Sequence, residues 1–159
     1  DQTEALTFAD EVVVMTRGRA VQVGAADALF ERPQHVFVGH FIGSPGMNFL
    51  SAQHQDGRLQ LAGYSLAISQ PNLPSGPLQV GVRPEYLALS APDAPGALPC
   101  TVLRVQDIGT YWMLTAEVGG QMLRARLGSE TAAPAVGGTV WLKVLGEHTC
   151  FYQNEELLA

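Results

Sequence analysis

The residue types that most often bind metals are scattered along this chain. None of its four histidines is spaced from another as in a helical zinc motif, and none lies next to a Cys-x-x-Cys pair. His148 and Cys150 fall on one side of an expected strand, but two ligands do not complete a zinc site. We therefore predict no metal site and assign structural roles to these side chains.

The segment Gly43-Ser44-Pro45-Gly46 places small residues around a serine, as a nucleophile elbow does. Its spacing differs from Gly-x-Ser-x-Gly, and an expected helix leads into it where an elbow needs a strand. A helix end is the favoured interpretation, and a hydrolase using Ser44, detectable with a fluorophosphonate probe, is the alternative. The chain also lacks a Gly-x-x-x-x-Gly-Lys-Ser/Thr phosphate loop, so we predict no catalytic and no cofactor-binding residues.

Two neighbouring aromatic residues, Tyr111 and Trp112, are a further candidate feature. They point to opposite faces of an expected strand, so one of them can stack on a base or a sugar. A core tryptophan beside a partly exposed tyrosine is the favoured interpretation. Nine basic residues against fifteen acidic ones give a formal charge of −6, which disfavours binding to phosphate backbones. We expect no nucleic-acid partner, with an oligonucleotide-binding OB domain as an alternative.

The composition predicts a folded, strand-rich protein. Of the 159 residues, 47% are hydrophobic and 15% are charged, which is enough apolar material for a core. Seventeen glycines and ten prolines favour short strands joined by tight turns. Cys100 and Cys150 are predicted to be buried thiols in a reducing cytosol. No run approaches the roughly 18 apolar residues of a membrane span, no signal peptide is visible, and a chain that begins at Asp1 is expected to be a fragment.

The first 46 residues differ in pattern from the rest. A short helix is expected over residues 1–10, followed by a strand over 11–16 that is apolar on both faces and therefore expected to be buried on both. A turn at Arg17-Gly18 leads to a second strand over 19–23. A helical turn around residues 27–30 ends before a proline, and a helix follows over 33–42.

After Pro45 the apolar period changes from that of a helix to that of a strand. Asp56-Gly57 is a typical hairpin turn, and residues 91–99, with three prolines, are expected to be a linker. Short strands at this spacing are typical of a small barrel or sandwich. Expected strands cover residues 47–52, 59–61, 64–68, 78–82, 101–105, 112–118, 123–127, 140–144 and 151–152.

Five segments, in order along the chain, resemble the ATP-binding subunits of carbohydrate-type ABC importers, the group that includes the maltose and glycerol-3-phosphate importer ATPases. The similarity fades after about Glu85, and Tyr86 stands where the family commonly has histidine. The five segments are Asp1-Gln2-Thr3-Glu4-Ala5, Ala9-Asp10 with Val12-Val13-Val14-Met15 and Gly18-Arg19, Gln22-Val23-Gly24, Phe41-Ile42-Gly43-Ser44-Pro45-Gly46-Met47-Asn48-Phe49-Leu50, and Gly81-Val82-Arg83-Pro84-Glu85.

The resemblance implies a mainly β fold with OB-like TOBE units, preceded by a short α/β remnant of the nucleotide-binding domain. It places that remnant at residues 1–46 and the regulatory domain at 47–159, with two β units divided near 91–99. The family's ATP- and Mg-binding motifs precede Asp1, so this fragment is expected to bind no cofactor and to be inactive alone. The implied function is regulation and dimerisation of an importer for sugars or glycerol-phosphate-like solutes.

The resemblance also implies partners: a second copy of the chain, the membrane permease subunits, and a regulatory protein, on the cytoplasmic face of the membrane. Its crossover segment, from Gly43 to Leu50, is the predicted hinge and interdomain contact. The residues chosen within it are Gly43, Ser44, Pro45, Met47, Asn48 and Phe49.

Four further residues are candidates for contacts between units or subunits. Arg83 and Glu85 are proposed as an ion pair, with an ordinary surface turn as the alternative. Phe37 and Phe41 lie on the helix that is expected to cover the apolar strand at residues 12–15, unless a second copy covers it. The alternative function is a stand-alone β domain that binds a small oxyanion or an oligosaccharide.

Overall fold

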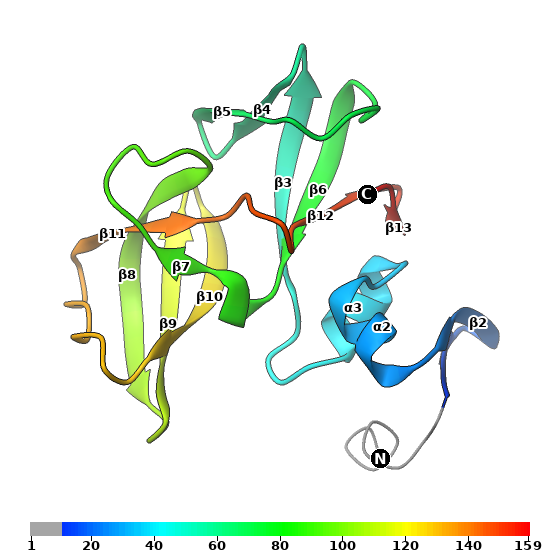
Figure 1. Ribbon diagram of the computed structural model, residues 1–159, viewed down its shortest axis with the longest axis horizontal. Helices are drawn as coiled ribbons and strands as arrows, with labels where there is room; N and C mark the ends of the chain where they lie inside the picture. Colours follow the sequence, from blue (N-terminus) through cyan, green and yellow to red (C-terminus); the bar gives the residue numbers. More distant parts are fainter. Residues whose placement is uncertain (1–10) are drawn as a thin grey trace.

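The computed structural model describes residues 11–159, and this part of the chain is mainly β, as predicted (Figure 1). It contains a two-stranded hairpin, a six-stranded sheet and a five-stranded sheet, all antiparallel. Two short helices lie beside the six-stranded sheet (Figure 1). The helix predicted for residues 1–10 lies outside the described residues. Within residues 11–159, no helix has the length and apolar character needed to cross a membrane.

The N-terminal described segment contains the predicted hairpin, but β1 is not buried on both faces. Val14 is 4% exposed, whereas Val13 and Met15 are 51% and 56% exposed. Among the described residues β1 pairs only with β2, and the helices cover only the side of the hairpin that carries Val14. The elements of this segment are β1 (Val12–Thr16), β2 (Arg19–Gly24), α2 (Ala26–Glu31) and α3 (Val36–Phe41).

Helix α3 begins three residues later than predicted. The extended backbone of His35 precedes it, and the His35 ring Nδ1 accepts a hydrogen bond from the backbone N–H of Phe37 at 2.9 Å. Pro33 and Gln34 stay outside the helix because their carbonyls accept hydrogen bonds from the C-terminal strands. The predicted pairing within the helix is confirmed: the rings of Phe37 and Phe41 stack with centroids 5.7 Å apart.

The six-stranded sheet has the order β13-β12-β6-β3-β4-β5. The predicted turn at Asp56-Gly57 joins β3 to β4, and both residues have positive φ, as a two-residue hairpin turn requires. Strands β12 and β13 come from the end of the chain and pair beside β6. The strands are β3 (Asn48–Gln55), β4 (Arg58–Leu61), β5 (Tyr64–Ala67), β6 (Gly76–Val82), β12 (Cys150–Gln153) and β13 (Glu156–Leu157).

The five-stranded sheet has the order β10-β9-β8-β11-β7 and curls into part of a barrel (Figure 1). The linker predicted for residues 91–99 is shorter, because Ala97 already begins β8. Pro99 fits in this strand because β9 pairs with β8 only from Thr101 onward, so no partner there needs its missing N–H. The elements are the 3₁₀ turn η1 (Pro84–Tyr86), β7 (Ala88–Leu89), β8 (Ala97–Asp107), β9 (Tyr111–Val118), β10 (Gln121–Gly128) and β11 (Thr139–Lys143).

One hydrophobic core lies between the two sheets, because the alternate apolar residues of both point inward. The predicted alternation in β10 is confirmed, with Leu123 and Ala125 buried and Arg124 and Arg126 exposed. Both cysteines are buried and unpaired, as predicted, and burial raises the pKa of the Cys100 thiol to about 11. Fully buried members of the core include Leu50, Leu59, Leu61, Val80, Leu98, Cys100, Leu114, Ala116, Ala125 and Leu142.

Candidate functional site

The most elaborate polar contacts lie at the junction, meaning the contact between the helical segment (residues 26–42) and the β module (residues 48–159). At its centre is Arg83, between the end of β6 and η1, with a side chain only 1% exposed. Its Nε donates to the carbonyl of Phe30 at 3.1 Å, and its Nη1 donates to the carbonyls of Gly39, at 3.2 Å, and Ile42. The guanidinium also lies over the Phe30 ring, 4.2 Å from its centroid.

The three carbonyls that Arg83 binds belong to the C-terminal ends of two helices. The last carbonyls of a helix have no partner within it and carry its partial negative charge. The single guanidinium of Arg83 thus donates hydrogen bonds to carbonyls at the C-terminal ends of both α2 and α3. Burial lowers the pKa of Arg83, and the charge of Glu85 opposes that effect. A guanidinium nevertheless stays protonated in proteins, so the site keeps its positive charge.

The alternative interpretation of Arg83 as part of a surface turn is wrong, because its side chain is buried. Glu85 is exposed and faces solvent on η1. Arg83 therefore contacts the helical segment through backbone carbonyls, and an intersubunit role for Arg83 and Glu85 stays a prediction. The sequence position of Arg83 could have indicated this role. Arg83 directly follows the buried end of β6, and a charged side chain that is buried there needs hydrogen-bond partners.

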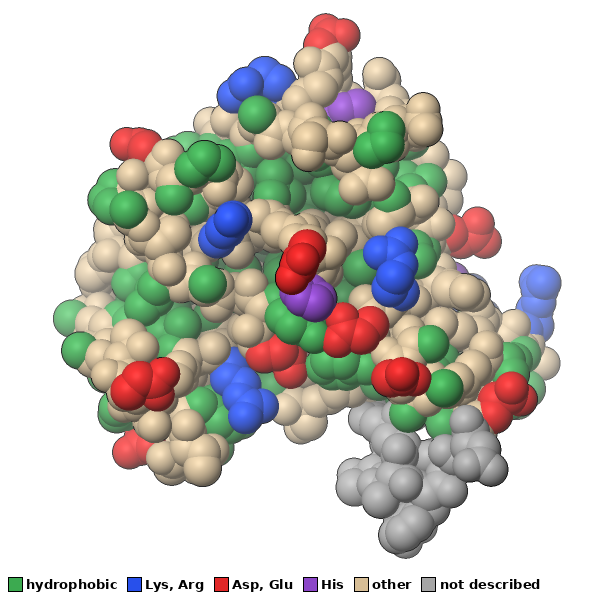
Figure 2. Space-filling model, in the orientation of Figure 1, with side chains coloured by type: hydrophobic (Ala, Val, Ile, Leu, Met, Phe, Trp, Pro, Cys, Tyr) green, Lys and Arg blue, Asp and Glu red, His purple; other side chains and the backbone are tan. Residues whose placement is uncertain are grey.

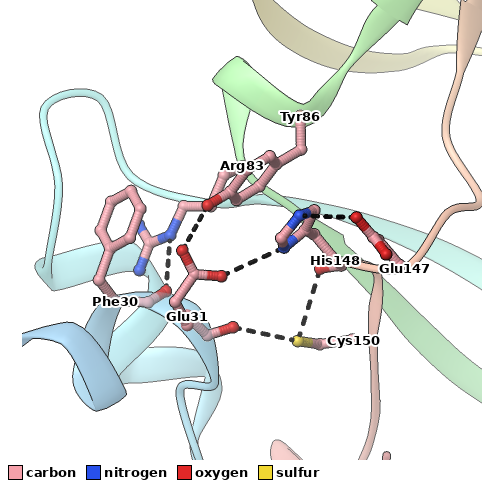
Figure 3. A network of polar contacts seen from close by, with 7 residues as sticks. All are labelled: Phe30, Glu31, Arg83, Tyr86, Glu147, His148 and Cys150. Carbon is pink, nitrogen blue, oxygen red and sulfur yellow. Dashed lines mark hydrogen bonds and ion pairs between the residues drawn. The ribbon is translucent and has the colours of Figure 1, made fainter.

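A second group of contacts surrounds Glu31 at the end of α2 (Figure 3). The hydroxyl of Tyr86 donates to one carboxylate oxygen of Glu31, and the other lies 3.2 Å from Nδ1 of His148. The His148 ring stacks on the Tyr86 ring, with centroids 3.9 Å apart and planes 6° apart. The hydrogen bond to Glu31 raises the pKa of Tyr86 to about 12, so the phenol remains the donor.

A third group of contacts joins the helical segment to the last two strands. The buried hydroxyl of Tyr152 donates to the carbonyl of Pro33 at 2.7 Å, and burial raises the pKa of this phenol. The backbone N–H of Leu157 donates to Gln34, and that of Val36 donates to Glu155, both at 2.9 Å. The chain therefore holds its N-terminal helices with its C-terminal hairpin.

The predicted hinge lies where the helical segment enters β3. Met47 is 3% exposed and packs in a small cluster with Val36, Cys150 and Tyr152. The Phe49 ring lies against this cluster, with its centroid 5.3 Å from that of Tyr152. Gly43, Ser44 and Pro45 form the connection after α3, so Ser44 follows a helix and not the strand that an elbow requires. The hinge role of these residues stays a prediction.

Two carboxamide side chains join the two sheets where β3 passes β10. Asn48 accepts a hydrogen bond from the N–H of Arg124 at 2.8 Å and donates to the carbonyls of Arg124, at 2.8 Å, and Val82, at 3.1 Å. Gln121 accepts from the N–H of Ser51 at 2.7 Å and donates to its carbonyl at 3.2 Å. Each carboxamide binds both the N–H and the carbonyl of one residue, as a paired strand would, and so Asn48 and Gln121 join β3 to β10.

These contacts hold the elements of the fold together. No group of three or more histidine, cysteine or acidic side chains within residues 11–159 is arranged to bind a metal ion. Trp112 donates its Nε1–H to the carbonyl of Thr131, and the Tyr111 ring lies under the guanidinium of Arg126. On the face drawn in Figure 2, basic side chains are scattered and do not form a continuous patch.

Comparison with known proteins identifies a TOBE domain at residues 80–151. The chain is also similar to curated proteins named sn-glycerol-3-phosphate import ATP-binding protein UgpC. The match to that of Vibrio vulnificus (strain CMCP6) is 37% identical and covers 76% of this chain and 33% of the relative. The match in Pectobacterium atrosepticum is 35% identical and covers 89% of this chain and 41% of the relative. The match in Salmonella typhimurium is 38% identical and covers 93% of this chain and 42% of the relative.

Among solved structures, the chain resembles the cytoplasmic molybdate-binding protein ModG with molybdate bound. The TM-score is 0.55 at 14% sequence identity, over 66% of this chain and 94% of ModG. This likeness concerns the fold, and it confirms the predicted OB-like β architecture. The chain spans less than half the length of the curated relatives it matches. Residues 80–151 therefore match a TOBE domain, and the chain resembles the C-terminal part of the ATP-binding subunits of carbohydrate-type ABC importers, as its sequence motifs predicted.

Proposed function

We propose that this chain is the regulatory and dimerisation region of the ATP-binding subunit of an ABC importer for sugars or glycerol-phosphate-like solutes. The TOBE domain and the similarity to glycerol-3-phosphate import subunits support this assignment. In the longer protein, ATP and Mg would be bound by a domain that contains the phosphate loop, which residues 1–159 lack. Such a subunit works on the cytoplasmic face of the membrane with permease subunits.

The observation that carries this proposal is the way the helical segment is fixed to the β module. Arg83, Tyr152 and the backbone of β13 all bind carbonyls of residues 30–42. A contact built from several buried hydrogen bonds transmits a rigid-body movement from one side to the other. The TOBE domain would thereby follow the motion of the domain to which the helices belong.

The function is tested with a hybrid subunit. Residues 1–159 replace the matching C-terminal part of the Pectobacterium atrosepticum relative, in a strain that lacks its own subunit. We expect growth on sn-glycerol 3-phosphate to exceed that supported by the same relative truncated before this part. A hybrid that accumulates normally but supports no more growth than the truncated protein contradicts the proposal. If the isolated chain then binds molybdate or an oligosaccharide in calorimetry, the stand-alone binding function is favoured.

We also infer that the chain forms a homodimer. Val13, Met15 and Val23 of the hairpin are each more than half exposed, as is expected for side chains that a second surface covers. Light scattering of the chain at micromolar concentration is expected to give twice the 17.0 kDa monomer mass. Replacing Val13 and Met15 with serine should shift the measured mass toward that of the monomer if this face is the contact. A wild-type mass of one chain at all concentrations refutes the inference.

A further inference from the structure

The helical segment covers only part of the face of the six-stranded sheet on which Tyr152 lies. Around Phe49 and Cys150 the helices pack against this face. Farther along β3 and β6 the same face forms a groove of about 410 Å³, a volume within the range of small-molecule sites. Tyr152 lies at the boundary, because its hydroxyl binds Pro33 and its side chain also lines the groove.

The groove is lined mainly by carboxamide side chains. Strand pairing places Gln53 of β3 beside Gln60 of β4, and the register of β6 puts Gln79 on the same face. Gln153, at the end of β12, and Asn154, just after it, complete the set. Five of the ten residues that line the groove therefore carry a carboxamide, and none of the ten is charged.

Most of the hydrogen-bonding capacity of these side chains is unused. Within residues 11–159, the carboxamides of Gln53, Gln79 and Gln153 make no hydrogen bond. Gln60 donates to the hydroxyl of Ser65 at 3.1 Å, which leaves its amide oxygen available. The floor offers no open strand edge to a peptide, because β3 and β6 each lie between two other strands. Recognition in this groove therefore depends on the carboxamides.

The chemistry of the lining selects a class of ligand. A carboxamide presents a donor and an acceptor in one plane, and a hydroxyl group also both donates and accepts hydrogen bonds. A phosphate or carboxylate would lose its hydration here, and no lysine or arginine lines the groove to replace it. The exposed ring of Pro77 adds an apolar surface for C–H groups. A sugar ring combines hydroxyl groups with such C–H faces.

We propose that this groove binds a neutral, hydroxyl-rich small molecule of the class of unphosphorylated sugars. The carboxamides of Gln53, Gln60 and Gln79 bind its hydroxyl groups from three neighbouring strands. The inference goes beyond the proposed function, which assigns no ligand to these strands. A site of this kind can exist in an importer subunit or in a separate binding domain, so its failure would leave the transport proposal intact.

An NMR titration of the whole ¹⁵N-labelled chain with maltose tests the site. The side-chain NH₂ signals of Gln53, Gln79 and Gln153 should shift with a Kd of about 1–10 mM, because an open groove makes only a few exposed hydrogen bonds. Glucose and glucose 6-phosphate are a matched pair that differs by the phosphate. Glucose should shift the same signals, and glucose 6-phosphate should bind at least about fivefold more weakly.

Substitutions then locate the binding. Gln79→Met keeps the length of the side chain without its amide and should weaken maltose binding about five- to tenfold. Gln106→Met, on β8 of the other sheet, is the matched control and should bind maltose as the wild type does. If Gln79→Met alters signals outside the groove, Gln53→Glu replaces it. This exposed substitution keeps the side-chain shape, removes the amide donors and should show a similar loss.

Three results overturn the inference. The first is that neither maltose nor glucose moves the groove signals at concentrations up to about 50 mM, well above the expected Kd. The second is that Gln79→Met and Gln53→Glu bind maltose as tightly as Gln106→Met. The third is that glucose 6-phosphate binds as tightly as glucose, which would contradict the selection of a neutral ligand.

Discussion

Replacing Arg83 with methionine is expected to detach the helical segment and to lower the free energy of unfolding by about 3 kcal/mol. Methionine nearly matches the arginine stem in length but donates no hydrogen bond. The buried carbonyls of Phe30 and Ile42 would then lose this donor, whereas the carbonyl of Gly39 keeps the N–H of Met47. An unsatisfied buried carbonyl costs roughly 1–3 kcal/mol, so the loss exceeds that of an ordinary surface substitution.

Urea unfolding, combined with limited proteolysis of residues 26–42, measures this effect. Arg104→Met, at an exposed position of β8, is the matched control and should change the free energy of unfolding by less than about 0.5 kcal/mol. Arg83→Lys should fall between Arg83→Met and the wild type, because an ammonium keeps the charge but cannot bind three carbonyls in a planar fork. If Arg83→Met unfolds at the same urea concentration as Arg104→Met, the shared-cap role of Arg83 is wrong.

Gly46→Ala is expected to disturb the entry into β3 with an effect of similar size. A Cβ at this position would lie 2.3 Å from the carbonyl oxygen of His40 and 3.1 Å from that of Gly39. Both are backbone atoms, and the Gly39 oxygen also accepts a hydrogen bond from Met47 at 2.9 Å, so neither can move without separating the crossover from α3. Overpacking of this kind costs about 1–3 kcal/mol, and more when the neighbour is backbone.

Thermal unfolding provides the measurement for this substitution. A loss of 2–3 kcal/mol in a chain of this size lowers Tm by about 5–10 °C. Gly24→Ala is the matched control, because a Cβ there meets no atom within 4 Å. It should leave Tm unchanged or raise it slightly, since alanine restricts the unfolded chain. Equal Tm values for the two variants would show that the close approach of Gly46 to α3 does not constrain the fold.

The sheets follow from local patterns that the sequence displays openly. Alternation in residues 123–127 and the turn residues Asp56-Gly57 depend on neighbours only a few positions away, so they predict strands and hairpins well. The predicted boundaries of strands and helices were wrong where contacts with residues distant in the sequence determine them. Pro99 belongs to β8 because β9 does not pair with it, and α3 starts late because Pro33 and Gln34 bind the C-terminal strands.

The contacts at the junction were even less predictable from local sequence patterns. Glu31 and His148 are 117 residues apart, and no spacing rule connects them. The family motif that contains Arg83 predicts an ion pair with Glu85 between units or subunits, with a surface turn as the alternative, and neither interpretation includes backbone carbonyls as partners. Only the packing of two helix ends over β6 makes it a buried donor to backbone carbonyls.

The position of β12 has a consequence for how this chain acquires its structure. β12 lies beside β6, although all the strands of the other sheet are made between them. During synthesis, β6 of the six-stranded sheet has an unpaired edge until β12 emerges, roughly 70 residues later. The hydrogen bonds that join α3 and the preceding residues to the C-terminal strands also form only then. Such long-range pairing is intrinsically slow. The newly made chain therefore exposes the edge of β6 before folding is complete, and an unpaired edge can associate with other chains.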